Sequence, residues 1–268
     1  VQVLTVKNIA AVEYASVTAK NLEVSATSGV REGEEVVGGS KQISRIKNKI
    51  VRNKRNKRST GMILLDIEKA FDTVWHNGIL YKLLEANIPK YLCKLIADFL
   101  NNRRFTVSVN NVNSAPKSIL AGLPQGSVLS PLLYSIYTSD FPVPYYMETA
   151  YYADDTALIT SSKLTSALLK KMEKGLLAFH KYFHKWKIKI NHNKTQAIIF
   201  PFNKSPKRTP RRQIIFGNEN IAIKNSVKYL GVIFDKKLLF KNHIDQTCQK
   251  ALKTLKALWV LLNRRSNL

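Results

Sequence analysis

The sequence predicts an α+β fold, because its patterns indicate both helices and strands. Isoleucines recur at helical spacing at Ile43, Ile46 and Ile50, with basic residues between them, which indicates a basic amphipathic helix. The apolar run Gly61–Ile67 that follows is short and continuous, which is typical of a buried strand. A chain of 268 residues, 45% of them hydrophobic, is long enough to bury a core of this kind.

Proline, asparagine and apolar patterns predict the later elements. Residues 75–101 read as two helices separated at Pro89, because proline cannot continue a helix interior. The asparagine pair 110–111 lies between strand-like runs at 104–109 and 112–120 and therefore predicts a hairpin. The other expected elements are a helix over 128–139, two strands within 145–160, a helix of about 20 residues, strands at 188–190, 196–200, 213–216, 221–224 and 227–234, and a basic helix over 242–264.

The charge is distributed unevenly along the chain, which carries 43 basic and 18 acidic residues and a net charge of +25. Residues 1–40 are net negative at −2, whereas residues 41–268 hold 40 basic and 13 acidic residues, a net charge of +27. Gly38 and Gly39 lie at this break and predict a linker. A surface this basic favours nucleic acid as the partner. The most basic run, residues 52–58, fits a nuclear localisation signal, a phosphate contact or a solvated helix end.

Several protein classes do not fit the sequence. No apolar run approaches the ~20 residues that a membrane span needs, and no signal-like leader opens the chain. Cys93 and Cys248 are too few for a disulfide scaffold or a four-ligand zinc site. We therefore expect an intracellular protein that is not secreted. The first residue is Val rather than Met, so we expect a fragment or a joined reading frame.

Three carboxylates are candidates for chemistry. Asp66 ends an otherwise apolar strand, where a lone buried carboxylate is costly unless a partner or cation accompanies it. Asp154 and Asp155 are adjacent, and their charges repel unless solvent or a cation offsets them. Taken alone, the pair also fits a polar β-turn.

Read together, three motifs and a lysine resemble, in order and spacing, the palm of reverse transcriptases. They are Asp66-Ile67-Glu68-Lys69-Ala70-Phe71-Asp72, Gly122-Leu123-Pro124-Gln125-Gly126-Ser127-Val128-Leu129-Ser130-Pro131 and Tyr152-Ala153-Asp154-Asp155, followed by Lys194. Two further short segments resemble the jockey-type branch of non-LTR, LINE-like retrotransposons. They are Phe71-Asp72-Thr73-Val74-Trp75-His76 and Tyr229-Leu230-Gly231-Val232.

This resemblance runs from Gln42 to the C-terminus and implies a domain organisation. It implies a palm with partial fingers over 42–234, built as an antiparallel sheet with helices on one face. A small, basic, helical thumb-like region would follow over 235–268. Residues 1–41 stay unassigned and are expected not to resemble the family.

The resemblance implies an RNA-directed DNA polymerase that extends a DNA primer on an RNA template with deoxynucleoside triphosphates. Asp66 and Asp154 would bind two Mg²⁺ or Mn²⁺ ions, and Asp155 would support them. Lys194 would protonate the departing pyrophosphate, although an exposed turn lysine explains that residue equally well. Such an enzyme would act on nucleic acid in the nucleus.

The resemblance also assigns residues to the substrates. The Ile67 carbonyl would add an oxygen ligand. Phe71 would lie beneath the incoming sugar as a steric gate, with a buried core aromatic as the alternative. A second group would contact the template and primer strands of the nucleic acid. Gln125 and Gly126 would touch the templating base pair, and Leu230 and Gly231 would form the primer grip.

Two expected parts of such enzymes find no counterpart in residues 1–41. These are an endonuclease and the fingers strands whose basic residues hold the triphosphate. We therefore expect either a polymerase impaired in positioning its nucleotide or a remnant that only binds nucleic acid.

Overall fold

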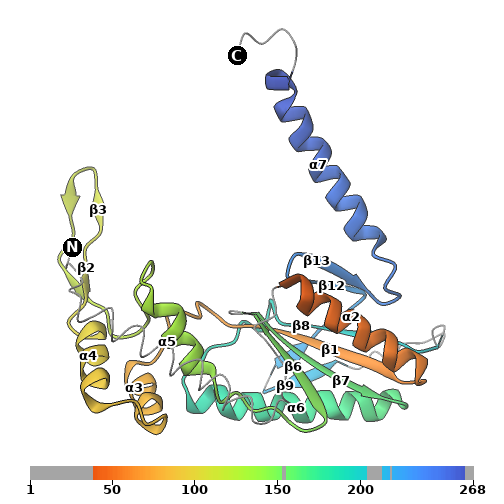
Figure 1. The fold of residues 1–268 in the computed structure, drawn as a ribbon, viewed down its shortest axis with the longest axis horizontal. Coiled ribbons are helices and arrows are strands. Elements are labelled where there is room, and N and C mark those ends of the chain that lie inside the picture. The colour runs from red at the N-terminus through yellow and green to blue at the C-terminus, as the bar shows by residue number, and fades with distance from the viewer. Residues whose placement is uncertain (1–38, 153–154, 204–212, 218, 263–268) are drawn as a thin grey trace. The chain divides into compact units, whose positions relative to one another are not determined.

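The computed structural model describes residues 39–152, 155–203, 213–217 and 219–262 (Figure 1). Its helices are α2 Gly39–Arg55, α3 His76–Glu85, α4 Lys90–Leu100, α5 Leu129–Thr138, α6 Thr165–Lys185 and α7 Lys241–Leu262. Its strands are β1 Ser59–Asp66, β2 Arg104–Phe105, β3 Ser108–Val109, β4 Val112–Asn113, β5 Lys117–Ser118, β6 Met147–Tyr152, β7 Asp155–Ser162, β8 Gln196–Phe200, β9 Ile214–Phe216, β10 Glu219–Ile221, β11 Ile223–Lys224, β12 Ser226–Tyr229 and β13 Val232–Asp235.

The chain forms two compact units. Of the described residues, 66–144 and 175–191 form one, which we call the helical unit. Residues 39–65, 145–174 and 192–262 form the other, the sheet unit.

A five-stranded sheet with the order β11-β8-β1-β7-β6 is the main feature of the sheet unit. β1 pairs antiparallel with β8, and β6 pairs antiparallel with β7. β11 pairs with β8 in parallel, so the expectation of an antiparallel sheet holds except at this edge. The α+β class itself is confirmed.

Helices cover both faces of this sheet, which corrects the expectation of helices on one face. Successive residues of a strand point to opposite faces, and Met62 of β1 packs in the same cluster as Ile46 and Ile50 of α2. The preceding residue, Gly61, faces the other way, where an added Cβ would collide with Met172 of α6. Gly61 is therefore small because α6 packs closely there.

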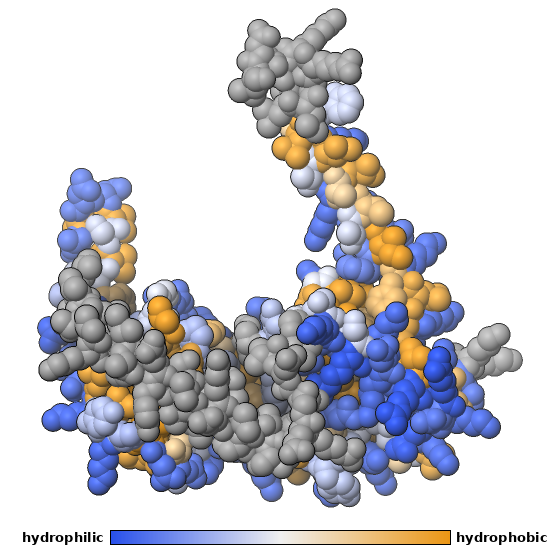
Figure 2. Space-filling view, in the orientation of Figure 1, coloured by the Kyte–Doolittle hydropathy of each residue, from blue (hydrophilic) through white to orange (hydrophobic). Residues whose placement is uncertain are grey.

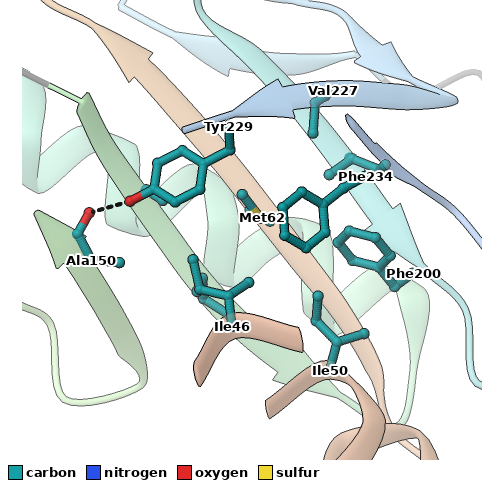
Figure 3. Packing of buried hydrophobic residues seen from close by; sticks show 11 residues of the cluster. Ile46, Ile50, Met62, Ala150, Phe200, Val227, Tyr229 and Phe234 are labelled. Carbon is teal, nitrogen blue, oxygen red and sulfur yellow. Dashed lines mark hydrogen bonds between the residues drawn. The ribbon is translucent and has the colours of Figure 1, made fainter. Parts of the chain in front are cut away.

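The core under α2 is apolar and joins α2 to six strands (Figure 3). Gln42, Ile46, Ile50 and Asn53 are the buried positions of α2, and their helical spacing places them on one side of the helix. The cluster also contains residues from β1, β6, β7, β8, β12 and β13: Met62, Ala150, Ala157, Ile159, Ile198, Phe200, Val227, Tyr229 and Phe234. α2 thus ties the sheet to the separate β12–β13 hairpin.

The helical unit contains a different core, in which aromatic rings surround a lysine. Lys82 of α3 is 4% exposed, donates to Asp140 and Tyr182, and lies 4.0 Å from the centroid of the Trp186 ring. Tyr137 also donates its hydroxyl hydrogen to the Trp186 carbonyl. These contacts fasten the C-terminal half of α6 to α3 and α5.

Most predicted elements occur, and several differ from the expectation. Gly39, predicted in a linker, is the first residue of α2. The predicted strand 188–190 reduces to a single bridge between Ile190 and Ile67. The predicted strands 221–224 and 227–234 are each divided, the second by a turn at Leu230 and Gly231.

α7 is exposed along its described side chains except at His243, which is half-buried. Hydrophobic residues are visible along it (Figure 2). Leu252 and Trp259 are among its exposed large side chains. Within the described residues, no helix combines the length and the apolar character that a membrane span requires.

Candidate active site

Asp66 lies where the buried strand β1 ends. Met62, Ile63 and Leu65 before it are at most 2% exposed, whereas Asp66 itself is half-buried. Its carbonyl oxygen accepts a hydrogen bond from the Asn191 backbone N–H at 2.8 Å. The main chain therefore fixes this strand end through its own hydrogen bond.

The segment after Asp66 is held in the same way. Ile67 is 7% exposed and forms the bridge to Ile190. The next residue, Glu68, donates its N–H to the Lys189 carbonyl at 2.8 Å. The predicted site residues Asp66 and Ile67 are thus consecutive residues of a backbone segment that is hydrogen-bonded to residues 189–191.

The β6–β7 hairpin carries Asp155, the second residue of the acidic pair. Its register pairs Tyr152 with Asp155, and Asp155 is exposed as the first residue of β7. Asp154, predicted as a metal ligand, lies outside the described residues. β7 is the neighbour of β1 in the sheet order, so the strand that begins at Asp155 lies next to the strand that ends at Asp66.

Tyr229 connects this hairpin to the predicted primer grip. Its side chain is 3% exposed, and its hydroxyl donates to the Ala150 carbonyl of β6 at 3.4 Å (Figure 3). Burial first, and the negative charge of Asp155 second, raise the pKa of Tyr229 well above its usual range, while Arg45 acts in the opposite direction. The phenol therefore remains a protonated donor at neutral pH.

Leu230 and Gly231, predicted as the primer grip, form the two-residue turn between β12 and β13. Both have positive φ, at 44° and 83°, and Tyr229 pairs with Val232 across the turn. Two positive φ angles match the twist of a tight hairpin. Leu230 packs against the core, whereas nothing lies within 4 Å of a Cβ built on Gly231.

The loop with Gln125 and Gly126 rests on the segment after Asp66. Gly122 has φ +87°, and an added Cβ would lie 2.5 Å from the Asp72 carbonyl oxygen. Leu123 donates its N–H to the Phe71 carbonyl at 2.8 Å, and the Gln125 side chain donates to the Asp72 carboxylate at 3.1 Å. The structure thus brings Phe71 and Gln125, two predicted substrate residues, onto one surface of the helical unit.

Gly126 differs from Gly122 in its surroundings. It is exposed with φ +80°, and nothing lies within 4 Å of a Cβ built on it. Its conformation favours glycine, but its packing does not require one. The open space leaves its backbone accessible to a ligand.

Phe71 is half-buried and stacks on Tyr134, with ring centroids 4.7 Å apart and an interplanar angle of 29°. Both interpretations of Phe71 therefore remain. One ring face is engaged in the core, as for a core aromatic, and the partial exposure leaves room for a contact with substrate.

Three residues of this region were missed from the sequence. Asp72 is the partner of Gln125, and His76 Nε2 and the Arg103 guanidinium both contact the Gly122 carbonyl, at 2.8 and 2.6 Å. Burial lowers the pKa of Arg103. Asp72 and His76 belong to the motif Phe71–His76 that resembles jockey-type elements, so this motif could have pointed to them. The sequence around Arg103 contains no comparable motif.

Lys194 is exposed in the turn before β8, three residues after Asn191. It belongs to the sheet unit with Asp155, whereas Asp66, Phe71 and Gln125 belong to the helical unit. Among the residues that the structure describes, no three His, Cys, Asp or Glu side chains gather as a metal site would require.

The comparison with protein families identifies the chain. The family model described as reverse transcriptase (RNA-dependent DNA polymerase) matches residues 6–234. This match includes residues 6–41, so the expectation that this segment does not resemble the family does not hold for them.

Curated relatives come from mobile elements. The probable RNA-directed DNA polymerase from transposon BS of Drosophila melanogaster is 33% identical over 249 residues, covering 90% of this chain and 27% of that protein. The RNA-directed DNA polymerase from mobile element jockey of the same species is 35% identical over 225 residues, covering 81% of this chain and 24% of that protein. The resemblance to the jockey-type branch is thereby confirmed. The chain spans about a quarter of the length of these relatives.

The fold has solved counterparts. Apo telomerase from Candida tropicalis, truncated from its C-terminal domain, matches with a TM-score of 0.59 and 14% identity over 85% of this chain and 44% of that chain. At this identity the likeness concerns the fold alone. The family match over most of the chain decides the assignment: this chain belongs to the reverse transcriptase (RNA-dependent DNA polymerase) family.

Proposed function

We propose that this chain is the polymerase region of a jockey-like retrotransposon protein and extends a DNA primer on an RNA template. The observation that carries the proposal is the match to the reverse transcriptase family over residues 6–234, which include both acidic motifs. Asp66 ends β1, and Asp155 begins the neighbouring strand β7, within a chain of the reverse transcriptase family.

The carboxylates suit divalent cations. Their oxygens are hard ligands, which Mg²⁺ and Mn²⁺ prefer, and Asp66, Asp154 and Asp155 are the residues that would hold two ions. When bound, such ions activate a primer 3′ hydroxyl and stabilise the charge on the departing pyrophosphate. The Ile67 carbonyl would supply a further oxygen.

The other residues position the reactants. Phe71 would restrict the sugar of the incoming nucleotide, and Gln125 and Gly126 would contact the templating pair. The turn at Leu230 and Gly231 would support the primer end. These roles are favoured by the half-exposed Phe71 ring, by the open backbone at Gly126 and by the tight β12–β13 turn.

Lys194 would donate a proton to the leaving pyrophosphate. Its exposure before β8 allows it to reach solvent and ligand alike. This chemistry would take place on nucleic acid in the nucleus, with deoxynucleoside triphosphates as substrates.

The test is primer extension on RNA templates of defined sequence. The proposal expects incorporation that requires the RNA template, follows its bases and stops when divalent ions are chelated. In a Phe71→Val variant, incorporation of ribonucleotides should rise relative to deoxynucleotides. Binding of primer–template without any incorporation would contradict the proposal and favour the remnant that only binds nucleic acid.

A further inference from the structure

One side of α2 carries a line of hydrogen-bond donors. Seven of its 17 residues are basic and none is acidic. Five polar residues repeat at alternating spacings of four and three, which places them along one side of the helix away from its buried positions. We call them the α2 stripe: Lys41, Arg45, Asn48, Arg52 and Arg55. All are exposed except Arg45, which is half-buried.

This composition differs from that of an ordinary solvated helix. Exposed helices gain stability from opposite charges three or four residues apart, and like charges at that spacing repel. The α2 stripe places Arg52 near Arg55, and α2 contains no acidic residue. A polyanion bound along the stripe would relieve this repulsion.

The choice of residue also points to phosphate. Three of the four charged stripe residues are arginines, whose planar guanidinium matches the geometry of phosphate oxygens. The opposite flank of α2 carries lysines instead, at Lys47 and Lys54, both exposed. Lys49, the remaining basic residue near the buried side, pairs with Glu148 of β6.

α2 begins beside the proposed primer grip. A Cβ added to Gly39 would lie 3.7 Å from Leu230 and 3.7 Å from Tyr152. Six residues further along, the charge of Arg45 acts on the Tyr229 phenol. Beyond the other end of the helix, Arg58 donates to the Ser161 carbonyl near the end of β7.

The stripe therefore leads away from the end of the β6–β7 hairpin at Tyr152. From Lys41 to Arg55 it is about 21 Å long, at about 1.5 Å per residue. Hydrophilic residues predominate on the side of α2 that faces the viewer in Figure 2.

We propose that the α2 stripe binds the phosphate backbone of the primer–template duplex behind the primer end. The identity of this partner rests on the proposed function, because the stripe starts where the primer end would be supported. The contact would be independent of sequence, as phosphate contacts are. It would add affinity without taking part in the chemistry.

The test compares two double variants of the full chain that lose the same charge from the same helix. Arg52→Gln/Arg55→Gln removes two stripe residues, and Lys47→Gln/Lys54→Gln removes two from the opposite flank. Affinity for a fluorescent RNA–DNA duplex with a recessed primer end is measured from about 50 to 200 mM salt. Thermal unfolding checks that both variants are folded.

The stripe variant should bind more weakly, and the slope of log affinity against log salt should flatten by about 1 per lost phosphate contact, hence about 2. The flank variant should stay near wild type. Equal losses in the two variants would overturn the proposal, as would a loss seen only with single-stranded RNA. Single-nucleotide extension by wild type, recorded on the same samples, tests the proposed function separately: its failure would leave the binding comparison intact.

Discussion

Compared with the core of the sheet unit, the core of the helical unit is built around a buried cation. In the sheet unit, α2 and the strands bury hydrophobic side chains such as Met62 and Phe234 with no charge among them. In the helical unit, Tyr182 and Trp186 surround the ammonium group of Lys82. Apolar burial does not depend on pH, whereas a buried cation does. The two units should therefore respond differently to substitution and to pH.

The largest expected effect is a cavity in the sheet unit. Phe234 is fully buried, so Phe234→Ala should lower the free energy of unfolding by about 3–5 kcal/mol. Denaturant unfolding measures this loss. Phe105→Ala is the matched control, because Phe105 is 46% exposed and its replacement should change stability little. Equal losses in both variants would contradict the assignment of Phe234 to the core.

The second effect is a pH dependence that originates in the helical unit. Burial lowers the pKa of Lys82 to about 8, although Asp140 and Glu85 act to raise it, and Lys185 adds to the lowering. Between pH 8 and 10 the unfolded chain holds the lysine proton more tightly than the folded chain. Stability should therefore rise through this window by roughly 2–3 kcal/mol.

Lys82→Met isolates this effect. The substitution keeps the volume of the side chain and removes the charge. The free energy of unfolding should therefore change little between pH 8 and 10. Above about pH 10, Tyr137 opposes the gain, because burial raises its pKa to about 12 and the unfolded chain ionises first. A wild-type profile that matches the variant would show that Lys82 does not titrate in this range.

The smallest effect separates the two glycines of the loop over 122–126. Gly122→Ala would press a Cβ into the Asp72 backbone, whereas Gly126→Ala would place one in open space. Because both positions have positive φ, the backbone cost is similar and the difference reports packing. The free energy of unfolding, measured with denaturant, should be lower in Gly122→Ala than in Gly126→Ala by about 1–3 kcal/mol. Gly126→Ala should lower the rate of nucleotide incorporation in extension assays while changing the packing of the loop little.

The sequence was sufficient for elements whose signals are local. The pair Asn110–Asn111 predicted its hairpin turn, and both residues have positive φ, at 50° and 64°. Pro89 likewise marks the start of α4. The motif order also led to the correct family.

Other features depend on contacts between distant residues, which a single sequence does not reveal. Gly39 looked like a linker because glycine is common there, yet it lies in α2 against Leu230. The segment 188–190 is apolar at both ends like a strand, but its strand pairing is limited to the single bridge between Ile190 and Ile67. α6 covers the second face of the sheet through Met172, which packs against Gly61. No local sequence pattern predicts this contact.

The central claim, that Asp66 and Asp154 serve metal-dependent nucleotidyl transfer, is tested most directly by three matched substitutions. Asp66→Asn and Asp154→Asn each remove a ligand charge while keeping the side-chain shape, and Asp98→Asn makes the same change on the exposed side of α4, outside the motifs. Single-nucleotide extension and duplex binding are measured for each variant. Extension should fall by several orders of magnitude in the first two and stay near wild type in the third, with duplex binding retained throughout. Extension at wild-type rates in Asp66→Asn or Asp154→Asn would contradict the account.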